Sequence, residues 1–217
     1  GGYAAVIGGG QYVGVYGSWS SAMGGRNNYM YYPYAVIGGG SYNYVYSYAS
    51  TVVGGSYNRV YGAYATVGGG YTNSAYGSYA VVAGGDSNVA YAPWSTSVGG
   101  DDNYVAGYAA VVVGGQYNFL YSSYSAVGGG QYHYLYSYAA SVGGGYKNRV
   151  YGNYATVGGG SANTAEGQYA VTVGGSSSVA EGAYSTSVGG DDNYAGGDVA
   201  VVVGGEDNYA GGYAAVI

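Results

Sequence analysis

A Gly-Gly doublet recurs along the whole chain with a strict 15-residue period, and this period constrains the fold more than any other feature of the sequence. Fourteen doublets keep the spacing without an insertion or a deletion, so the 217 residues are about fourteen and a half copies of one 15-residue unit. A longer, 90-residue period lies over the short one, because residues 61–75 reappear in similar form as residues 151–165. We therefore interpret the six-unit blocks 31–120 and 121–210 as a duplication. The doublets begin at positions 9, 24, 39, 54, 69, 84, 99, 114, 129, 144, 159, 174, 189 and 204.

A unit of this length is too short for a pair of helices but fits one coil of a β-solenoid. The composition agrees, because 48 Gly disfavour helices, and two Leu, three Ile and one Phe cannot fill an ordinary globular core. When the doublet is numbered 9 and 10, strand-forming residues predict two short strands per coil, around positions 4–8 and 13–1. We predict an all-β fold, a parallel β-roll or β-helix of 15-residue coils, forming a single repetitive rod over residues 1–217.

Alternation along the strands assigns each position of the coil to a face. Position 5 is always Ala or Ser, position 7 is mostly Val or Ile, and position 15 is always apolar, so these positions are predicted to point inward. Tyr gathers at positions 1, 4, 12 and 14 and is expected mostly outside, since so short a coil offers no lumen for its ring. The doublets are expected to supply a turn, because Gly tolerates positive φ.

Asn occupies position 13 in eleven of the fourteen units. Stacked coils would bring these side chains about 4.8 Å apart, so we expect either a ladder of amides along the stack or a turn cap. His133, the one histidine of the chain, stands in the same column and is interpreted as a substitute for Asn. A catalytic base is the less favoured interpretation, because without Cys or a second His no nucleophile and base can be assembled. We expect no enzyme activity.

The consensus of the unit, as in residues 158–173 (GGGSANTAEGQYAVTV), resembles the head repeats of trimeric autotransporter adhesins, the YadA-like heads. The resemblance covers the whole chain at the level of the repeat pattern. It implies a β-roll of stacked coils with small and aliphatic residues inside, located outside the cell or at the cell surface. Similar runs occur in repetitive surface proteins and fibres of bacteria, archaea and phages.

Thirty-five Tyr against one Phe indicate that the hydroxyl matters, so the rings are expected to meet water, sugar or another chain at their tips. We predict a structural part of an extracellular filament, sheath or surface adhesin that self-associates into filaments or lateral bundles. The identical, in-phase segments GGYAAVI at residues 1–7 and 211–217 predict growth by continuation of the backbone ladder. The alternatives are a glycan- or receptor-binding fibre module and, less favoured, an ice-binding protein. The predicted interaction surface is Tyr16, Tyr31, Tyr46, Tyr61, Tyr76, Tyr91, Tyr121, Tyr136 and Tyr151.

The charged residues and the apolar runs of the sequence indicate which classes of partner are unfavourable. A net charge of −6 argues against nucleic acid, and no apolar run approaches the length of a membrane span. Residues 151–217 hold seven acidic residues and no basic one, which we interpret first as a solvated edge that keeps the protein soluble. The alternative is a calcium site formed by Asp191, Asp192, Glu206 and Asp207 in neighbouring coils. No other cofactor is expected.

Overall fold

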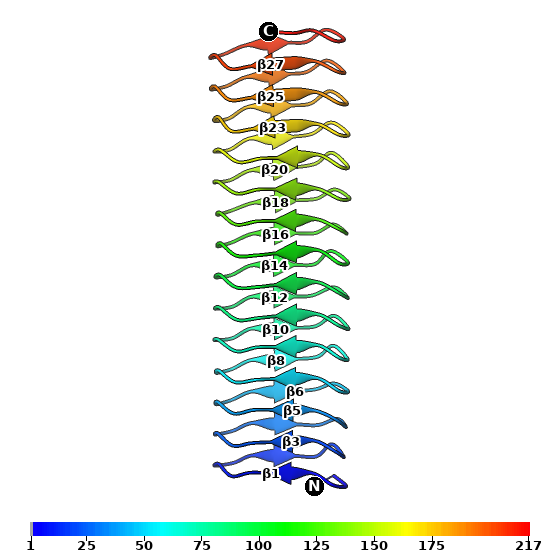
Figure 1. The fold of residues 1–217 in the computed structure, drawn as a ribbon, viewed down its shortest axis with the longest axis vertical. Coiled ribbons are helices and arrows are strands. Elements are labelled where there is room, and N and C mark those ends of the chain that lie inside the picture. Colours follow the sequence, from blue (N-terminus) through cyan, green and yellow to red (C-terminus); the bar gives the residue numbers. More distant parts are fainter. Residues whose placement is uncertain (1) are drawn as a thin grey trace. The chain divides into compact units, whose positions relative to one another are not determined.

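The computed structural model describes residues 2–217 and divides into two compact units, Gly1–Ala109 and Ala110–Ile217. Each unit is a β-solenoid in which 15-residue coils stack on one another, and the described residues contain no helix (Figure 1). Every coil contributes one short strand to each of two parallel sheets. Paired strands are offset by one coil, as in the pairing of Thr51 with Thr66 and of Val52 with Val67. The predicted fold class is confirmed.

The first unit contains two parallel sheets, one of odd-numbered and one of even-numbered strands. The odd strands are β1 (Val6–Ile7), β3 (Ser21–Ala22), β5 (Val36–Ile37), β7 (Thr51–Val52), β9 (Thr66–Val67), β11 (Val81–Val82) and β13 (Thr96–Ser97). The even strands are β2 (Gly14–Val15), β4 (Tyr29–Met30), β6 (Tyr44–Val45), β8 (Arg59–Val60), β10 (Ser74–Ala75), β12 (Val89–Ala90) and β14 (Tyr104–Val105).

The second unit repeats this organisation, with three slightly longer strands toward its end. Its odd strands are β15 (Val111–Val112), β17 (Ala126–Val127), β19 (Ser141–Val142), β21 (Thr156–Val157), β23 (Val171–Val173), β25 (Thr186–Val188) and β27 (Val201–Val203). Its even strands are β16 (Phe119–Leu120), β18 (Tyr134–Leu135), β20 (Arg149–Val150), β22 (Thr164–Ala165), β24 (Val179–Ala180), β26 (Tyr194–Ala195) and β28 (Tyr209–Ala210). The expectation of one domain over residues 1–217 stays a prediction.

The strands are shorter than the sequence predicts, because both corners of the coil contain a left-handed residue that is not glycine. Most strands cover positions 6–7 and 14–15 alone, whereas 4–8 and 13–1 were expected. Position 4 has positive φ in every coil, as in Tyr64 (φ 60°), and so does position 12, as in Tyr57 (φ 59°). This conformation is unfavourable for residues other than Gly, Asn and Asp, so something in the stack must stabilise it.

Backbone hydrogen bonds between coils provide that stabilisation. In the strands an N–H donates to the following coil, as Thr66 does to the Ala80 carbonyl at 2.9 Å. At the left-handed corners the N–H points the other way, and Tyr64 donates to the Tyr48 carbonyl of the preceding coil at 3.0 Å. The left-handed residue therefore lets the hydrogen-bonded stack continue around the corner, where an extended residue would leave its polar groups unpaired.

The glycine doublets take part in the turn mainly through their second member. Gly40, at position 10, has φ 82°, and a side chain there would collide with the Gly55 carbonyl of the next coil. By contrast, Gly39 and Gly54 at position 9 face open space and lack a positive φ. The expectation that the doublet supplies the turn is correct for position 10 in these coils, and the left-handed residue at position 12 completes this corner.

The core of each unit is a thin column of small and aliphatic side chains. Positions 5, 7 and 15 are buried as predicted in all coils but the first and the last, for example Ala35, Ile37 and Val45, each with no exposed surface. In the first and last coils Ile7 and Ile217 are exposed. No Tyr of the described residues is buried, so the prediction that the rings lie outside is confirmed as well.

The Asn column is also buried, and it caps the glycine turns. The side-chain amide of Asn58 donates to the Gly54 carbonyl of its own coil at 3.0 Å and to the Gly70 carbonyl of the next coil at 3.2 Å. Its oxygen accepts the main-chain N–H of Asn73 at 2.9 Å. Of the two alternatives, the turn cap therefore describes these contacts, and the side chains bond to backbone rather than to one another in most coils.

His133 occupies the column in the manner of an asparagine. Its main-chain N–H donates to Oδ1 of Asn118 and its Nδ1 accepts the N–H of Asn148, each at 3.2 Å. Its Nε2 is buried without a hydrogen bond. Burial lowers the pKa of His133 below its ordinary 6.5. The folded chain therefore holds a neutral imidazole.

We expect Ala155→Leu to overpack the stack, because Ala155 and its neighbours Ala140 and Ala170 at position 5 are buried. The cost should be about 1–3 kcal/mol in the free energy of unfolding, measured by urea titration. Ala126→Leu is the matched control, since Ala126 is exposed at position 6 of β17, and it should change stability by less than about 0.5 kcal/mol. Equal stability of the two variants would contradict the inward assignment of position 5.

We also expect the neutral His133 to make stability depend on pH. Below about pH 6.5 the unfolded chain binds a proton that the folded chain resists, so wild-type stability should fall by up to about 1.4 kcal/mol per pH unit until the folded pKa is reached. Because this is the one histidine of the chain, His133→Asn should remove that loss. The free energies of unfolding at pH 7.5 and 5.5 test the point, and the same pH dependence in both proteins would refute it.

Candidate functional site: the tyrosine columns

The predicted interaction surface forms an ordered stack of rings within each unit. We call it the first-position column, since its residues stand at position 1 of their coils. Ring centroids of neighbouring coils lie 4.6–5.5 Å apart, and the planes are within 12° of parallel in all pairs except Tyr76–Tyr91, which is tilted by 42°. The column contains Tyr16, Tyr31, Tyr46, Tyr61, Tyr76 and Tyr91 in the first unit and Tyr121, Tyr136 and Tyr151 in the second.

Stacking perturbs the phenols of this column. Partial burial raises the pKa of Tyr31, Tyr46, Tyr61 and Tyr136 above the ordinary 10.0, and the neighbouring tyrosines raise it further. Two phenolates one coil apart would repel each other, so each ring makes ionisation of the next less favourable. These four hydroxyls are therefore neutral donors and acceptors at physiological pH.

A second column of rings runs along the corner at positions 3 and 4, and the sequence analysis missed it as a surface. Where position 4 is Ala, position 3 is Tyr in every case, so each of these coils keeps one ring at this corner. The coil with Asp198 and Val199 at these positions has no ring there. The corner column is Tyr3, Trp19, Tyr34, Tyr48, Tyr64, Tyr79, Trp94 and Tyr108 in the first unit, and Tyr124, Tyr138, Tyr154, Tyr169, Tyr184 and Tyr213 in the second.

The position of the ring in the coil decides how it meets its neighbour. Tyr64, Tyr79 and Trp94 all stand at position 4, and neighbouring planes lie within 7° of parallel at 5.0 and 4.2 Å. Tyr48 stands at position 3, and it meets Tyr34 and Tyr64 edge to face, at 68° and 74°. In both cases the rings remain in contact, so the exchange between positions 3 and 4 preserves the column.

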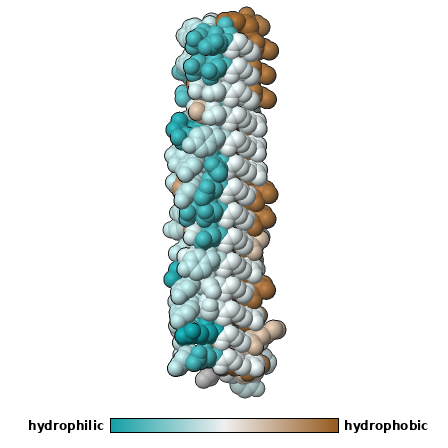
Figure 2. All heavy atoms as spheres, turned by 90° about the vertical axis from the view of Figure 1, so that its left-hand side faces the viewer, coloured by the Kyte–Doolittle hydropathy of each residue, from teal (hydrophilic) through white to brown (hydrophobic). Residues whose placement is uncertain are grey.

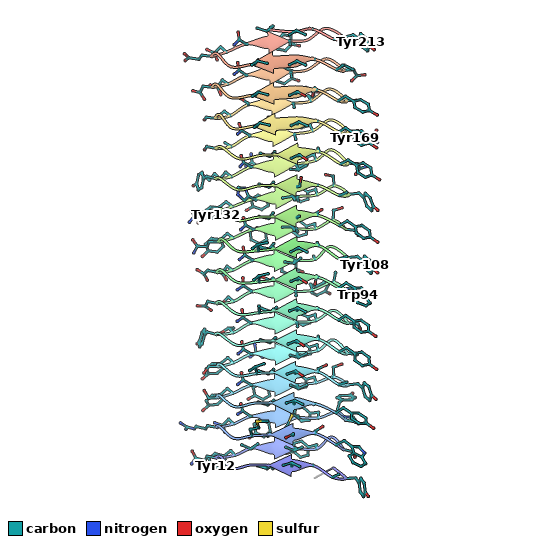
Figure 3. All side chains as sticks on the ribbon, in the orientation of Figure 1. Tyr12, Trp94, Tyr108, Tyr132, Tyr169 and Tyr213 are labelled. Carbon is teal, nitrogen blue, oxygen red and sulfur yellow. The ribbon has the colours of Figure 1, made fainter. Side chains whose placement is uncertain are left out.

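The opposite corner, at positions 11 and 12, contains a less continuous set of rings. Tyr42 and Tyr57 stack at 4.8 Å, and Tyr117 and Tyr132 at 5.1 Å. Figure 3 shows Tyr12 and Trp94 at opposite edges of the coils of the first unit. Tyr71 and Tyr146, at position 11, meet Tyr57 and Tyr132 edge to face, at 71° and 82°. The other residues of this corner are mostly polar, and Figure 2 shows its face with polar residues gathered along one edge and apolar ones along the other. The exposed apolar residues before the doublets include Met23, Val53, Val113, Val173 and Val203.

The acidic residues of the candidate calcium site lie at this opposite corner. Asp191 and Glu206 are β-bridge partners in neighbouring coils, and the Asp207 N–H donates to the Asp191 carbonyl at 3.1 Å. Asp192 and Asp207 both adopt positive φ, of 50° and 55°. Among residues 2–217, no group of three or more His, Cys, Asp or Glu side chains is arranged to hold a metal ion. Calcium binding stays a prediction.

We compared the sequence with protein-family models and with curated proteins. No protein-family model matches the sequence, and no curated protein is similar to it. In the part of the chain that the structure describes, no helix is long and apolar enough to cross a membrane.

Proposed function

We propose that the protein is a structural subunit or segment of an extracellular filament, sheath or surface adhesin. In this proposal, separate copies of the protein associate side by side through the tyrosine columns. The observation that carries the proposal is the corner column, where a ring is retained through the exchange between positions 3 and 4. Retention of the ring at one corner, coil after coil, favours a contact surface over rings that only fill strand positions. The extracellular setting rests on the resemblance of the repeats to adhesin heads.

The exposure of the rings supports lateral contact. Tyr64, Tyr79 and Trp94 stand next to one another and are 49%, 43% and 50% exposed. A stripe of large, partly apolar rings on a protein surface is a common feature of binding sites, and burying it against a second stripe removes apolar surface from water. The hydroxyls at the ring edges can hydrogen-bond across such a contact. The first-position column supplies a further stripe of the same kind.

Growth along the stack is the second mode of assembly in the proposal. Within each unit, every coil pairs with the next by parallel backbone hydrogen bonds in a fixed register. A further coil with the same 15-residue period can add by the same bonds, because any exposed strand edge presents unpaired N–H and carbonyl groups. Lateral and axial contacts together would produce a fibre or a sheath.

Recognition of glycans is less well supported by the ring geometry. Sugars stack on the faces of aromatic rings, whereas Tyr79 turns its faces toward Tyr64 and Trp94. The edges and hydroxyls of the rings remain for solvent or a partner. This arrangement favours contact between two ridges of rings over a platform for a saccharide.

The proposal is tested with the triple variant Tyr64→Asn, Tyr79→Asn and Trp94→Asn. Asn removes each ring yet tolerates the positive φ of 60–62° at these positions, so the fold should persist. We expect wild-type protein to associate with increasing concentration in sedimentation velocity experiments, and the triple variant to need at least about a tenfold higher concentration for the same degree of association.

The matched control is Tyr12→Asn, Tyr42→Asn and Tyr57→Asn at the opposite corner, where φ is 56–59°. It removes three rings from the same unit, at positions that have the same left-handed backbone conformation, and it should associate as the wild type does. Wild-type protein that stays monomeric at high concentration, or association of the first variant at wild-type strength, would overturn the proposal.

A further inference from the structure

The first-position column differs from the corner column in a way that bears on chemistry. All its members are Tyr, whereas Trp19 and Trp94 interrupt the corner column. Its rings stack face to face in every pair except Tyr76–Tyr91, as in Tyr31–Tyr46 at 5.1 Å and 4°. Two parallel tyrosine rings at this separation place the carbon beside each hydroxyl near its counterpart in the next coil. Those carbons carry much of the unpaired electron density of a tyrosyl radical.

The backbone holds these pairs in place. Tyr31 donates its N–H to the Val45 carbonyl at 3.1 Å, and Tyr46 donates to the Val60 carbonyl at 2.8 Å. The centroids are farther apart than the roughly 3–3.5 Å of reacting atoms in a near-attack arrangement, so coupling needs a tilt of the two rings. The rings have room to tilt outward, because Tyr16 and Tyr91 are 58% and 53% exposed and Tyr61 is 39% exposed.

We propose that the first-position column is a site of oxidative cross-linking, at which tyrosines of neighbouring coils are joined into dityrosine by hydrogen peroxide and a peroxidase. Each of two phenols loses one electron and one proton to give a radical, and the two radicals form one carbon–carbon bond between the rings. Both ring carbons then lose their hydrogens as the phenols regain theirs, for a total loss of two hydrogen atoms. Hydrogen peroxide takes up the two electrons and two protons and leaves as two molecules of water.

The consequence is a covalent bond between consecutive coils. Such a bond closes a loop of one coil length in the unfolded chain, which lowers the entropy of the unfolded state and raises the melting temperature. The inference goes beyond the proposed assembly and does not depend on it, since the reaction joins residues of one unit. Failure of lateral association would leave it standing.

The test oxidises dilute purified protein with limiting hydrogen peroxide and horseradish peroxidase. Dityrosine is quantified by its fluorescence, and cross-linked peptides are mapped by pepsin digestion and mass spectrometry. We expect the links to join first-position tyrosines of neighbouring coils, the product to migrate as a monomer on a denaturing gel, and the yield per chain to be independent of protein concentration. The same protein unfolded in urea should give links scattered among all its tyrosines.

The variant Tyr31→Phe, Tyr61→Phe and Tyr91→Phe keeps the stacked rings but leaves no neighbouring tyrosine pair in the column of the first unit. Two of the seven neighbouring pairs of the column remain, both in the second unit, so the yield of links that map to the column should fall about threefold. The matched control is Tyr12→Phe, Tyr32→Phe and Tyr213→Phe. These three tyrosines are 69%, 52% and 82% exposed and form no ring pair among the described residues, so the control should match the wild type.

Three results would overturn the inference, and each is measured on the oxidised wild type or by comparison of the two variants. The first is links distributed according to exposure, which would make the control lose more than the column variant. The second is links between chains alone, and the third is no dityrosine at all in the folded protein. Melting curves of both variants before oxidation establish that they are folded.

Discussion

The backbone hydrogen bond between coils is the interaction on which the rest of the structure depends. The interior consists of Ala, Ser, Val and a few larger side chains, so apolar burial per residue is small. The stack is stabilised instead by backbone hydrogen bonds from one coil to the next, both in the strands and at the corners. Every such bond needs the same register between neighbouring coils, which the constant 15-residue period provides. An insertion of one residue within a strand would turn the side chains that follow it in that strand to the opposite face.

Much of this could be predicted from the sequence because the constraints repeat. Invariant small residues at position 5 and apolar ones at positions 7 and 15 indicate an inward face, and the structure buries them. The corners could not be predicted in the same way. Tyr57 and Tyr64 have positive φ in spite of their residue type, since the inter-coil bond and not the local preference decides their conformation. Strands were therefore expected to extend across residues that are in fact turns.

In the candidate site, too, one feature could be predicted from the sequence and another could not. The first-position column could be predicted because one residue type recurs at one position, from Tyr16 to Tyr91. The corner column was missed because its ring moves between positions 3 and 4, and a comparison of single positions conceals the exchange. Tyr48 beside Ala49 shows the exchange in the sequence, because this coil has Ala in place of the ring at position 4 and Tyr at position 3. Stacking distances near 5 Å then follow from the spacing of the coils.

Amide hydrogen exchange tests the central claim most directly, because it reports on each inter-coil bond separately. The account predicts that the corner amides of Tyr57 and Tyr64, which donate to the preceding coil, exchange as slowly as the strand amide of Thr66. The amide of Ala63, for which the structure holds no such bond, should exchange much faster. Corner amides that exchange as fast as that of Ala63, beside protected strands, would contradict the claim that hydrogen bonds continue around the corners and stabilise their left-handed residues.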